Sequence, residues 1–217
     1  MAISKSTASH TYNISYDYWL RTPDKEPHHL YLLLHGFSQR GESIFKKLEP
    51  VLPQNAAVLS INAPFPSPVK IKEEYKEAYA WYFYLSKEKR FVIPPTESAR
   101  SIHKLLTSLG LINLPVHIIG FSQGGYMVPW LVREFPKVTR AITIAADYPN
   151  HYYEGLPAYQ FDAVHGVDDK VAPIEEVKRN IESLVASGRS VSLHEVSNTG
   201  HEVNDLMIGK IRELVEA

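Results

Sequence analysis

The 217-residue chain contains no cysteine, and this absence removes several kinds of chemistry at once. Disulfide bridges, thiolate nucleophiles and thiolate metal sites are all excluded. A chain without cysteine is also compatible with a reducing compartment. Because its first residues lack an apolar core of the length found in signal peptides, we expect the protein to be cytoplasmic.

Long apolar runs and an excess of one charge are missing as well. The longest apolar runs are far too short to cross a bilayer, so no stable membrane association is expected. The 23 Lys and Arg residues nearly balance the 24 Asp and Glu residues, which gives a formal net charge of −1 at pH 7. Both signs are scattered along the chain, and this distribution argues against binding of nucleic acid.

What is present is the composition of an ordinary soluble globular protein, with 44% hydrophobic and 22% charged residues. The sequence contains no internal repeat, low-complexity tract or flexible linker. Residues 1–217 are therefore expected to form a single domain, and its oligomeric state stays open.

Apolar runs rich in β-branched residues alternate with segments of helical period. The expected strands are residues 29–36, 56–64, 115–120, 138–147, 158–166 and 190–198, with residues 12–20 as an outer antiparallel strand. The expected helices are residues 42–52, 96–110, 123–135, 173–188 and 203–216. Several of the strands are almost continuously hydrophobic, which is typical of burial on both faces of a parallel sheet. The alternation predicts an α/β fold with a mostly parallel central sheet and helices on both faces.

Single residues suggest where two of these helices begin, end or bend. Thr96 is a candidate N-cap and Gly110 a candidate C-terminal stop for one of them. Pro129 lies inside the segment 123–135 and is expected to kink it, because proline lacks the backbone donor and its ring displaces a carbonyl.

One segment interrupts the alternation. Residues 65–95 begin and end in prolines and carry a cluster of aromatic residues, of which 79–85 are compatible with a strand. Long loops in compact domains are often functional. These aromatics either cap the core or form a wall of a substrate pocket, and the second interpretation suggests a hydrophobic or aromatic acyl or alcohol group.

The stretch 120-GFSQG-124 matches the pattern G-x-S-x-G. In this pattern the serine occupies a sharp turn from a strand into a helix, and the two glycines leave room for the neighbouring backbone. An expected strand precedes Ser122 and an expected helix follows it. Ser122 is therefore a candidate nucleophile, although the pattern by itself often occurs by chance.

A serine nucleophile of this kind needs an acid and then a histidine base later in the chain. His201 follows the last expected strand, where one ring nitrogen can reach the serine and the other an aspartate. Asp169, on the loop after the strand 158–166, is the expected acid. Asp168 beside it and Asp147 at the end of an earlier strand remain alternatives.

Acyl transfer also needs an oxyanion hole with two fixed donors. One expected donor is the backbone N–H of Gln123, directly after the nucleophile. The other is the N–H of Phe37, on the loop that follows the strand 29–36. His35 and His165 are expected to be structural histidines that bind the loop backbone.

Five stretches together, LHGFSQRGE, NAPFP, GFSQGG, HGVDDKVAP and GHE, resemble the phospholipase/carboxylesterase branch of the α/β-hydrolases, which includes the acyl-protein thioesterases. The resemblance extends from about residue 30 to the end. It implies Ser122 as nucleophile, Asp169 as acid and His201 as base. It also implies Phe37 and Gln123 as oxyanion donors, and hydrolysis of carboxylic esters or thioesters without any cofactor.

Three features depart from the pattern of that family. The strand end 145-AAD-147 stands where a Ser-Gly pair is expected, and this keeps Asp147 as an alternative acid. Pro129 is unusual in the helix after the nucleophile. The aromatic residues 79–84 differ from those of the thioesterases, so long-acyl substrates do not follow from the resemblance.

Other chemistries lack support in the sequence. His201 and Glu202 begin a pattern like H-E-x-x-H, but Asp205 stands where the second histidine is needed, so no metal site is expected. No phosphate-binding loop or G-x-G-x-x-G spacing is present, and no nucleotide cofactor is expected.

The sequence thus predicts a serine esterase that cleaves small carboxylic esters through a Ser–His–Asp triad and an acyl-enzyme. An acyl-thioesterase, a lactone hydrolase and a peptidase are alternatives among enzymes. A hydrolase-like protein that only binds a ligand is an alternative of another class, because such folds also host non-enzymes. A binding protein, however, has no need of all three triad residues.

Overall fold

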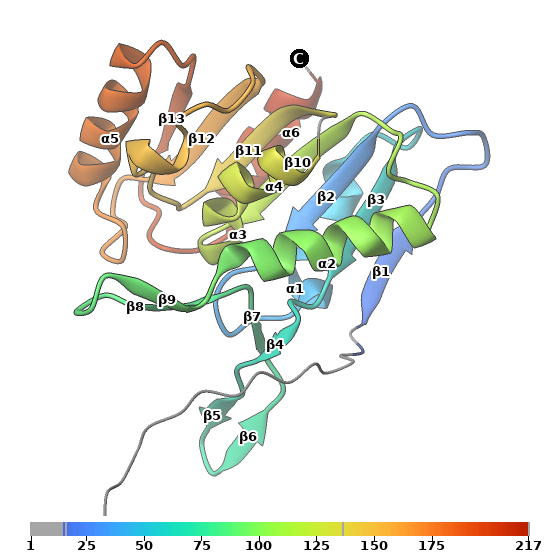
Figure 1. The fold of residues 1–217 in the computed structure, drawn as a ribbon, viewed down its shortest axis with the longest axis horizontal. Coiled ribbons are helices and arrows are strands. Elements are labelled where there is room, and N and C mark those ends of the chain that lie inside the picture. Colours follow the sequence, from blue (N-terminus) through green and yellow to red (C-terminus); the bar gives the residue numbers. More distant parts are fainter. Residues whose placement is uncertain (1–14, 16, 136, 217) are drawn as a thin grey trace, which may run out of the picture.

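The computed structural model describes residues 15, 17–135 and 137–216, and seven strands within them form the central sheet. The strands are β1 (Tyr18–Arg21), β2 (Leu30–Leu34), β3 (Ala57–Ile61), β10 (Val116–Phe121), β11 (Val138–Ile144), β12 (Gln160–Gly166) and β13 (Ser192–Val196). Their order across the sheet is β1, β3, β2, β10, β11, β12, β13 (Figure 1). The outer strand β1 pairs antiparallel with β3, and the other pairs are parallel. This confirms the predicted sheet, although residues 12–14 and 16 of the expected outer strand lie outside the described residues.

Helices cover both faces of this sheet (Figure 1). They are α1 (Gly41–Leu48), α2 (Pro95–Ser108), α3 (Gln123–Tyr126), α4 (Val128–Glu134), α5 (Ile174–Ala186) and α6 (Asp205–Glu216), with 3-10 turns at Glu49–Val51 and Asn150–Tyr152. Successive residues of β2 point to opposite faces, so Leu32 belongs to the hydrophobic cluster that includes residues of α2, α4 and α5, whereas Leu33 belongs to the cluster that includes residues of α1 and α6. Burial on both faces explains the nearly continuous apolar runs and confirms the α/β architecture. Among the described residues, no helix combines the length and apolar character needed to span a bilayer.

Parallel pairing brings the carboxyl ends of six strands, β3, β2, β10, β11, β12 and β13, to one edge of the sheet. Leu34 at the end of β2 is in register with Gly120 of β10, and Gly120 is in register with Thr143 of β11. The segments that follow β2, β10, β11, β12 and β13 therefore leave the sheet at the same edge. All the predicted site residues lie on these segments.

The start of α2 differs from the prediction. Pro94 occupies the N-cap position and Thr96 lies inside the first turn, so the assignment of Thr96 as N-cap is wrong. Pro95 explains the earlier start, because its ring presets a helical φ and the N–H it lacks has no partner in the first turn of a helix. Gly110, with φ of +71°, follows the helix as expected.

The expected bend at Pro129 takes the form of an interruption. The helical segment after the nucleophile is divided at Met127 into α3 and α4. Pro129 thereby falls in the first turn of α4, where its missing N–H breaks no hydrogen bond of that helix.

Residues 65–93, called the excursion below, form three small antiparallel sheets beside the central one. These sheets pair β4 (Phe65–Pro66) with β7 (Tyr79–Ala80), β5 (Val69–Ile71) with β6 (Glu74–Lys76), and β8 (Phe83–Leu85) with β9 (Arg90–Ile93). Figure 1 shows the β5–β6 and β8–β9 hairpins extending away from the helices and the central sheet. Trp81, between the two hairpins in sequence, is fully buried in the core, whereas Tyr84 in β8 is 41% exposed.

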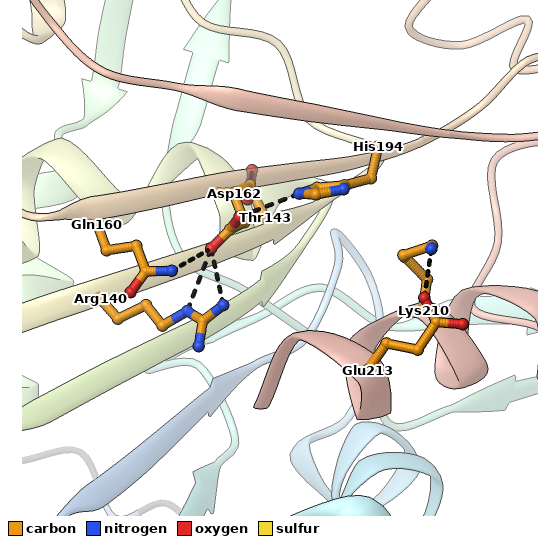
Figure 2. Close-up of polar contacts among 7 residues, drawn as sticks. All are labelled: Arg140, Thr143, Gln160, Asp162, His194, Lys210 and Glu213. Atoms are coloured by element: carbon orange, nitrogen blue, oxygen red, sulfur yellow. Dashed lines mark hydrogen bonds and ion pairs between the residues drawn. The ribbon is translucent and has the colours of Figure 1, made fainter. Parts of the chain in front are cut away.

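A buried polar network joins β11, β12 and β13 near their amino ends (Figure 2). One oxygen of Asp162 accepts hydrogen bonds from Nε and Nη2 of Arg140 at 3.1 and 3.0 Å, and the other accepts one from Nε2 of His194 at 3.0 Å. Asp162 is 3% exposed and Arg140 is 8% exposed, so each charge depends on the other for compensation. Arg140 and Asp162 lie in the amino-terminal halves of their strands, whereas the predicted site lies beyond the carboxyl ends.

Candidate active site

Ser122 occupies the turn between β10 and α3. Its backbone has φ of +48° and ψ of −117°, a conformation that residues with a side chain rarely adopt and that costs strain energy. The flanking glycines make the turn possible. A Cβ on Gly120 would lie 2.4 Å from the carbonyl oxygen of Gly124, and a Cβ on Gly124 would lie 2.4 Å from that of Leu34. The spacing of the pattern therefore follows from backbone crowding around a strained serine.

Three of the predicted site residues form a continuous chain of hydrogen bonds. Oγ of Ser122 lies 2.9 Å from Nε2 of His201, and Nδ1 of His201 lies 2.8 Å from Oδ2 of Asp169. A carboxylate can only accept, so Nδ1 carries the proton and Nε2 is left to accept the proton of the serine hydroxyl. This arrangement can generate a nucleophilic serine oxygen.

Asp169 is held in this position by the loop after β12. Its second oxygen, Oδ1, accepts the backbone N–H groups of Val171 and Ala172 at 2.8 and 2.9 Å. The side chain is fully buried. These two bonds fix the plane of the carboxylate with Oδ2 directed at His201, so the side chain does not have to rotate to bind the imidazole.

The two alternative acids occupy other environments in the structure. Asp147 accepts a hydrogen bond from Nδ2 of Asn180 at 2.6 Å. Asp168 is exposed to solvent. Among these three carboxylates, Asp169 is the one within hydrogen-bond distance of His201 in the described part of the chain.

His165 lies behind the Asp169 carboxylate. Its Nε2 is 2.8 Å from the carbonyl oxygen of Ala172 and 3.4 Å from Oδ2 of Asp169, and both side chains are fully buried. Burial lowers the pKa of His165, so the ring is neutral at pH 7. Its bond to the Ala172 carbonyl matches the expected role of holding the loop backbone.

The two predicted oxyanion donors are unpaired within the residues that the structure describes. The N–H of Phe37, on the loop after β2, donates no hydrogen bond there, and neither does the N–H of Gln123 at the start of α3. The first N–H groups of a helix have no acceptor within it, so the Gln123 N–H is available to a ligand.

His35 orients the peptide that carries the Phe37 N–H. Its Nδ1 donates to the carbonyl of Gly36 at 2.7 Å, and its Nε2 accepts the N–H of Ala63 at 2.9 Å. Because the C=O and N–H of a trans peptide point in opposite directions, the bond to the Gly36 carbonyl directs the Phe37 N–H away from His35. Burial lowers the pKa of His35 to about 4, so the ring stays neutral and keeps its acceptor nitrogen at pH 7.

A cavity of about 440 Å³ borders His201. Its apolar lining is mostly aliphatic and comes from Ile44, Val69, Ile71, Ala78, Phe121 and Val203. Charged residues of both signs also line it: Arg40, Lys47, Lys76, Glu77 and Glu202. The excursion lines this cavity through residues of the segment 69–78, whereas Trp81 of its aromatic run packs into the core.

Residues 19–217 match the model of the family described as Phospholipase/Carboxylesterase. The chain belongs to the phospholipase/carboxylesterase family. The family resemblance seen in the motifs is thereby confirmed over nearly the whole sequence. No match was found among curated proteins.

Solved structures of similar fold cover almost all of the chain. Acyl-protein thioesterase 2 of Zea mays is 19% identical with a TM-score of 0.68, over 92% of this chain and 97% of that one. Esterase PE8 is 17% identical with a TM-score of 0.70, over 94% and 99%. The carboxylesterase of Bacillus cereus is 16% identical with a TM-score of 0.65, over 93% of each chain. At these identities the likeness establishes the α/β-hydrolase fold.

The departures from the pattern of the phospholipase/carboxylesterase family can now be placed. Ala145, in the strand end 145-AAD-147, has φ of +51°. Asp147, two residues later, accepts a hydrogen bond from Asn180. The cavity beside His201 is lined by aliphatic residues of the excursion, so the expectation that its aromatic run walls a pocket is not met at this cavity.

Sequence reasoning treated residues 79–84 as one aromatic group and missed the separate position of Trp81. Its indole and its backbone both bind residues of the site, as described below. The sequence shows that Trp81 alone in this run carries a ring N–H, but it does not reveal that this N–H will meet the carbonyl group of His35.

Proposed function

We propose that this chain is a serine hydrolase that cleaves carboxylic esters through an acyl-enzyme. The observation that carries the proposal is the chain of hydrogen bonds from Ser122 through His201 to Asp169. Membership of the phospholipase/carboxylesterase family supports the same chemistry. The substrate is a small ester, and no cofactor takes part.

In the first half-reaction, Oγ of Ser122 attacks the acyl carbon while Nε2 of His201 accepts the hydroxyl proton. The electron pair of the carbonyl moves onto its oxygen, which the N–H groups of Phe37 and Gln123 bind. Each such donor contributes about 3 kcal/mol to the transition state. As the carbonyl re-forms, the bond to the leaving alkoxide breaks, and the alkoxide takes the proton from His201.

In the second half-reaction, water replaces the alcohol. Nε2 of His201 accepts a proton from water as the water oxygen attacks the acyl carbon. The same two N–H groups bind the oxyanion. Its collapse breaks the bond to Oγ of Ser122, which regains its proton from His201, and the carboxylic acid leaves. Throughout, Asp169 stabilises the imidazolium form of His201.

The cavity beside His201 supports an aliphatic acyl or alcohol group of moderate size. The same mechanism also cleaves thioesters and lactones, because only the leaving group differs. A ladder of oxygen esters and thioesters with matched acyl chains therefore decides the preferred class.

The test is hydrolysis of p-nitrophenyl esters and acyl thioesters from two to ten carbons by wild type, Ser122→Ala and Ser108→Ala. Ser108 lies exposed at the end of α2 and serves as the matched control. We expect Ser122→Ala to lose about 10⁵-fold in kcat, as triad serines do, and Ser108→Ala to keep full activity.

Labelling gives an independent readout of the nucleophile. A fluorophosphonate should add once to wild type and to Ser108→Ala, and should leave Ser122→Ala unlabelled in intact-mass spectra. A wild-type chain that hydrolyses nothing on the ladder and takes up no label would show that it is a binding protein. Lactone turnover without ester turnover would instead redirect the proposal to lactones.

A further inference from the structure

The two proposed oxyanion donors lie on different segments, the loop after β2 and the start of α3. Their spacing therefore depends on contacts between these segments. Trp81 of the excursion contacts both. Its indole Nε1 donates to the carbonyl of His35 at 2.7 Å, and its backbone N–H donates to Oε1 of Gln123 at 2.8 Å.

The bond from the indole completes the anchoring of the oxyanion loop. Of the peptide between His35 and Gly36, the carbonyl accepts from Trp81, and the N–H donates to Oε1 of Gln39 at 3.1 Å. Of the next peptide, the Gly36 carbonyl accepts from the ring of His35. The backbone carbonyl of His35 and both backbone polar groups of Gly36 are therefore hydrogen-bonded, and the N–H of Phe37 that follows them is, within the described residues, free to bind a ligand.

The Gln123 side chain forms the second half of the link. Besides accepting from the Trp81 N–H, it donates from Nε2 to the carbonyl of Tyr82 at 2.9 Å. A side-chain amide thus pairs with the excursion backbone at two points, and the residue that carries it also supplies the second oxyanion donor.

Trp81 is itself held by several contacts. It is fully buried, its carbonyl accepts from Oγ of Ser98 in α2 at 2.5 Å, and its ring lies 4.9 Å from the ring of His35. Because Trp81 is bound to both the loop after β2 and the start of α3, it holds these two segments at a fixed distance from each other. An oxyanion hole needs such preorganisation, because donors that must rearrange during the reaction lose much of their effect.

We propose that Trp81 is a positioning residue, which fixes the N–H groups of Phe37 and Gln123 at the spacing that an oxyanion requires. The inference rests on the proposed hydrolase function and adds a residue that touches neither substrate nor the triad. The excursion is then part of the catalytic framework as well as a wall of the cavity.

The experiment compares Trp81→Phe with Trp130→Phe, which makes the same chemical change on α4, where the ring packs against Phe91 and Tyr152. Three readouts are needed: kcat and KM for a p-nitrophenyl ester, the inhibition constant of a trifluoromethyl ketone, and the midpoint of thermal unfolding. The ketone is informative because it forms a tetrahedral oxyanion on the serine. For Trp81→Phe we expect kcat to fall about 10- to 100-fold with KM unchanged, since a shift of about 1 Å at a donor has effects of this size. The ketone should weaken by the same factor, and Trp130→Phe should match wild type.

Gln123→Met provides a second variant in case Trp81→Phe does not fold. It keeps the backbone N–H of residue 123 and removes both side-chain bonds to the excursion, so it should reproduce the loss in kcat and in ketone binding.

Wild-type kcat in both variants would overturn the inference. A loss of activity that appears only as a higher KM, with kcat unchanged, would overturn it too, because it would indicate weaker substrate binding and no loss at the oxyanion. A wild-type chain without hydrolase activity would overturn the proposed function together with this inference, whereas an active wild type with unaffected variants overturns the inference alone.

Discussion

Oδ2 of Asp169 accepts a hydrogen bond from Nδ1 of His201 at 2.8 Å, although 32 residues separate them in sequence. The backbone N–H groups of Val171 and Ala172 bind the other oxygen, so the loop sets the direction of the carboxylate. This relationship makes the choice among the three acids a question of geometry that mutation can test.

Asp169→Asn should lower kcat about 10³- to 10⁴-fold, because an amide group at this position favours the wrong tautomer of His201. Asp147→Asn serves as the matched control, since its carboxylate pairs with Asn180 instead. We expect that variant to retain nearly full activity on the same p-nitrophenyl ester. If Asp147→Asn were the inactive variant and Asp169→Asn the active one, the assignment would be wrong.

The sequence was sufficient for the architecture because the relevant signals are local. Apolar runs of strand length, separated by amphipathic segments, define the parallel sheet without any knowledge of contacts. The order of Ser122, Asp169 and His201 along these elements then places them at one edge, since parallel strands share their direction. The structure brings these side chains together as the spacing suggested.

What the sequence could not give depends on contacts between distant segments. Nothing local indicates that the indole of Trp81 meets the carbonyl of His35, 46 residues earlier. The start of α2 was misplaced for a different reason. Thr96 is a good capping residue, but the two prolines before it already fix the backbone in the conformation of a helix start.

The glycines around the nucleophile allow a prediction about stability. In Gly124→Ala the new Cβ would lie 2.4 Å from the carbonyl oxygen of Leu34, a backbone atom that cannot move without disturbing the sheet. We expect the free energy of unfolding to fall by about 3 kcal/mol, at the upper end of the usual cost of overpacking. Urea denaturation monitored by circular dichroism would measure it.

Gly209→Ala is the control for that substitution. Gly209 lies within α6, and apart from the adjacent residues and the backbone of its own helix no atom of the described residues would come within 4 Å of a Cβ there. Alanine favours the helix, so this variant should gain about 0.5–1 kcal/mol. Equal stability changes in the two variants would contradict the role assigned to crowding at Gly124.

The buried network of Figure 2 should contribute to stability but not to catalysis. Arg140→Met removes the charge opposite Asp162 and leaves a carboxylate that is 3% exposed, with His194 and Gln160 as its remaining side-chain hydrogen-bond partners. Breaking a buried pair in this way costs about 3–5 kcal/mol. The network lies within the strands and contacts none of the triad residues in the described part of the chain, so the remaining folded fraction should keep the wild-type kcat.

A double mutant separates the pair from its surroundings. Replacing Asp162 by Asn in the Arg140→Met background removes the uncompensated charge, and stability should recover by more than 1 kcal/mol relative to the single variant, about the size of coupling between contacting residues. Additive losses across this cycle would show that Arg140 stabilises the sheet by packing alone.

The last prediction concerns acid pH. Burial lowers the pKa of His35 to about 4 from its ordinary 6.5, and burial together with the charges of His29 and Arg140 lowers the pKa of His117 to about 4 as well. Between about pH 4 and pH 6.5, the two histidines bind protons in the unfolded chain but not in the folded chain. The stability that the neutral rings provide is therefore complete above about pH 6.5 and is lost as the pH falls toward 4.

For His35, which is fully buried, this loss amounts to about 3 kcal/mol.

His117 offers the cleaner substitution, because its Nδ1 has no hydrogen-bond partner among the described residues and its ring packs edge-on against Tyr31 at 5.0 Å. His117→Phe keeps a ring that does not titrate, so the free energy of unfolding should depend less steeply on pH between 6.5 and 4 than in wild type. Tyr31→Phe is the neighbouring control, since it removes a hydroxyl and no group that titrates in this range. Urea midpoints at several pH values would measure the slopes, and a His117→Phe slope equal to that of wild type would contradict a neutral, desolvated His117 in the folded protein.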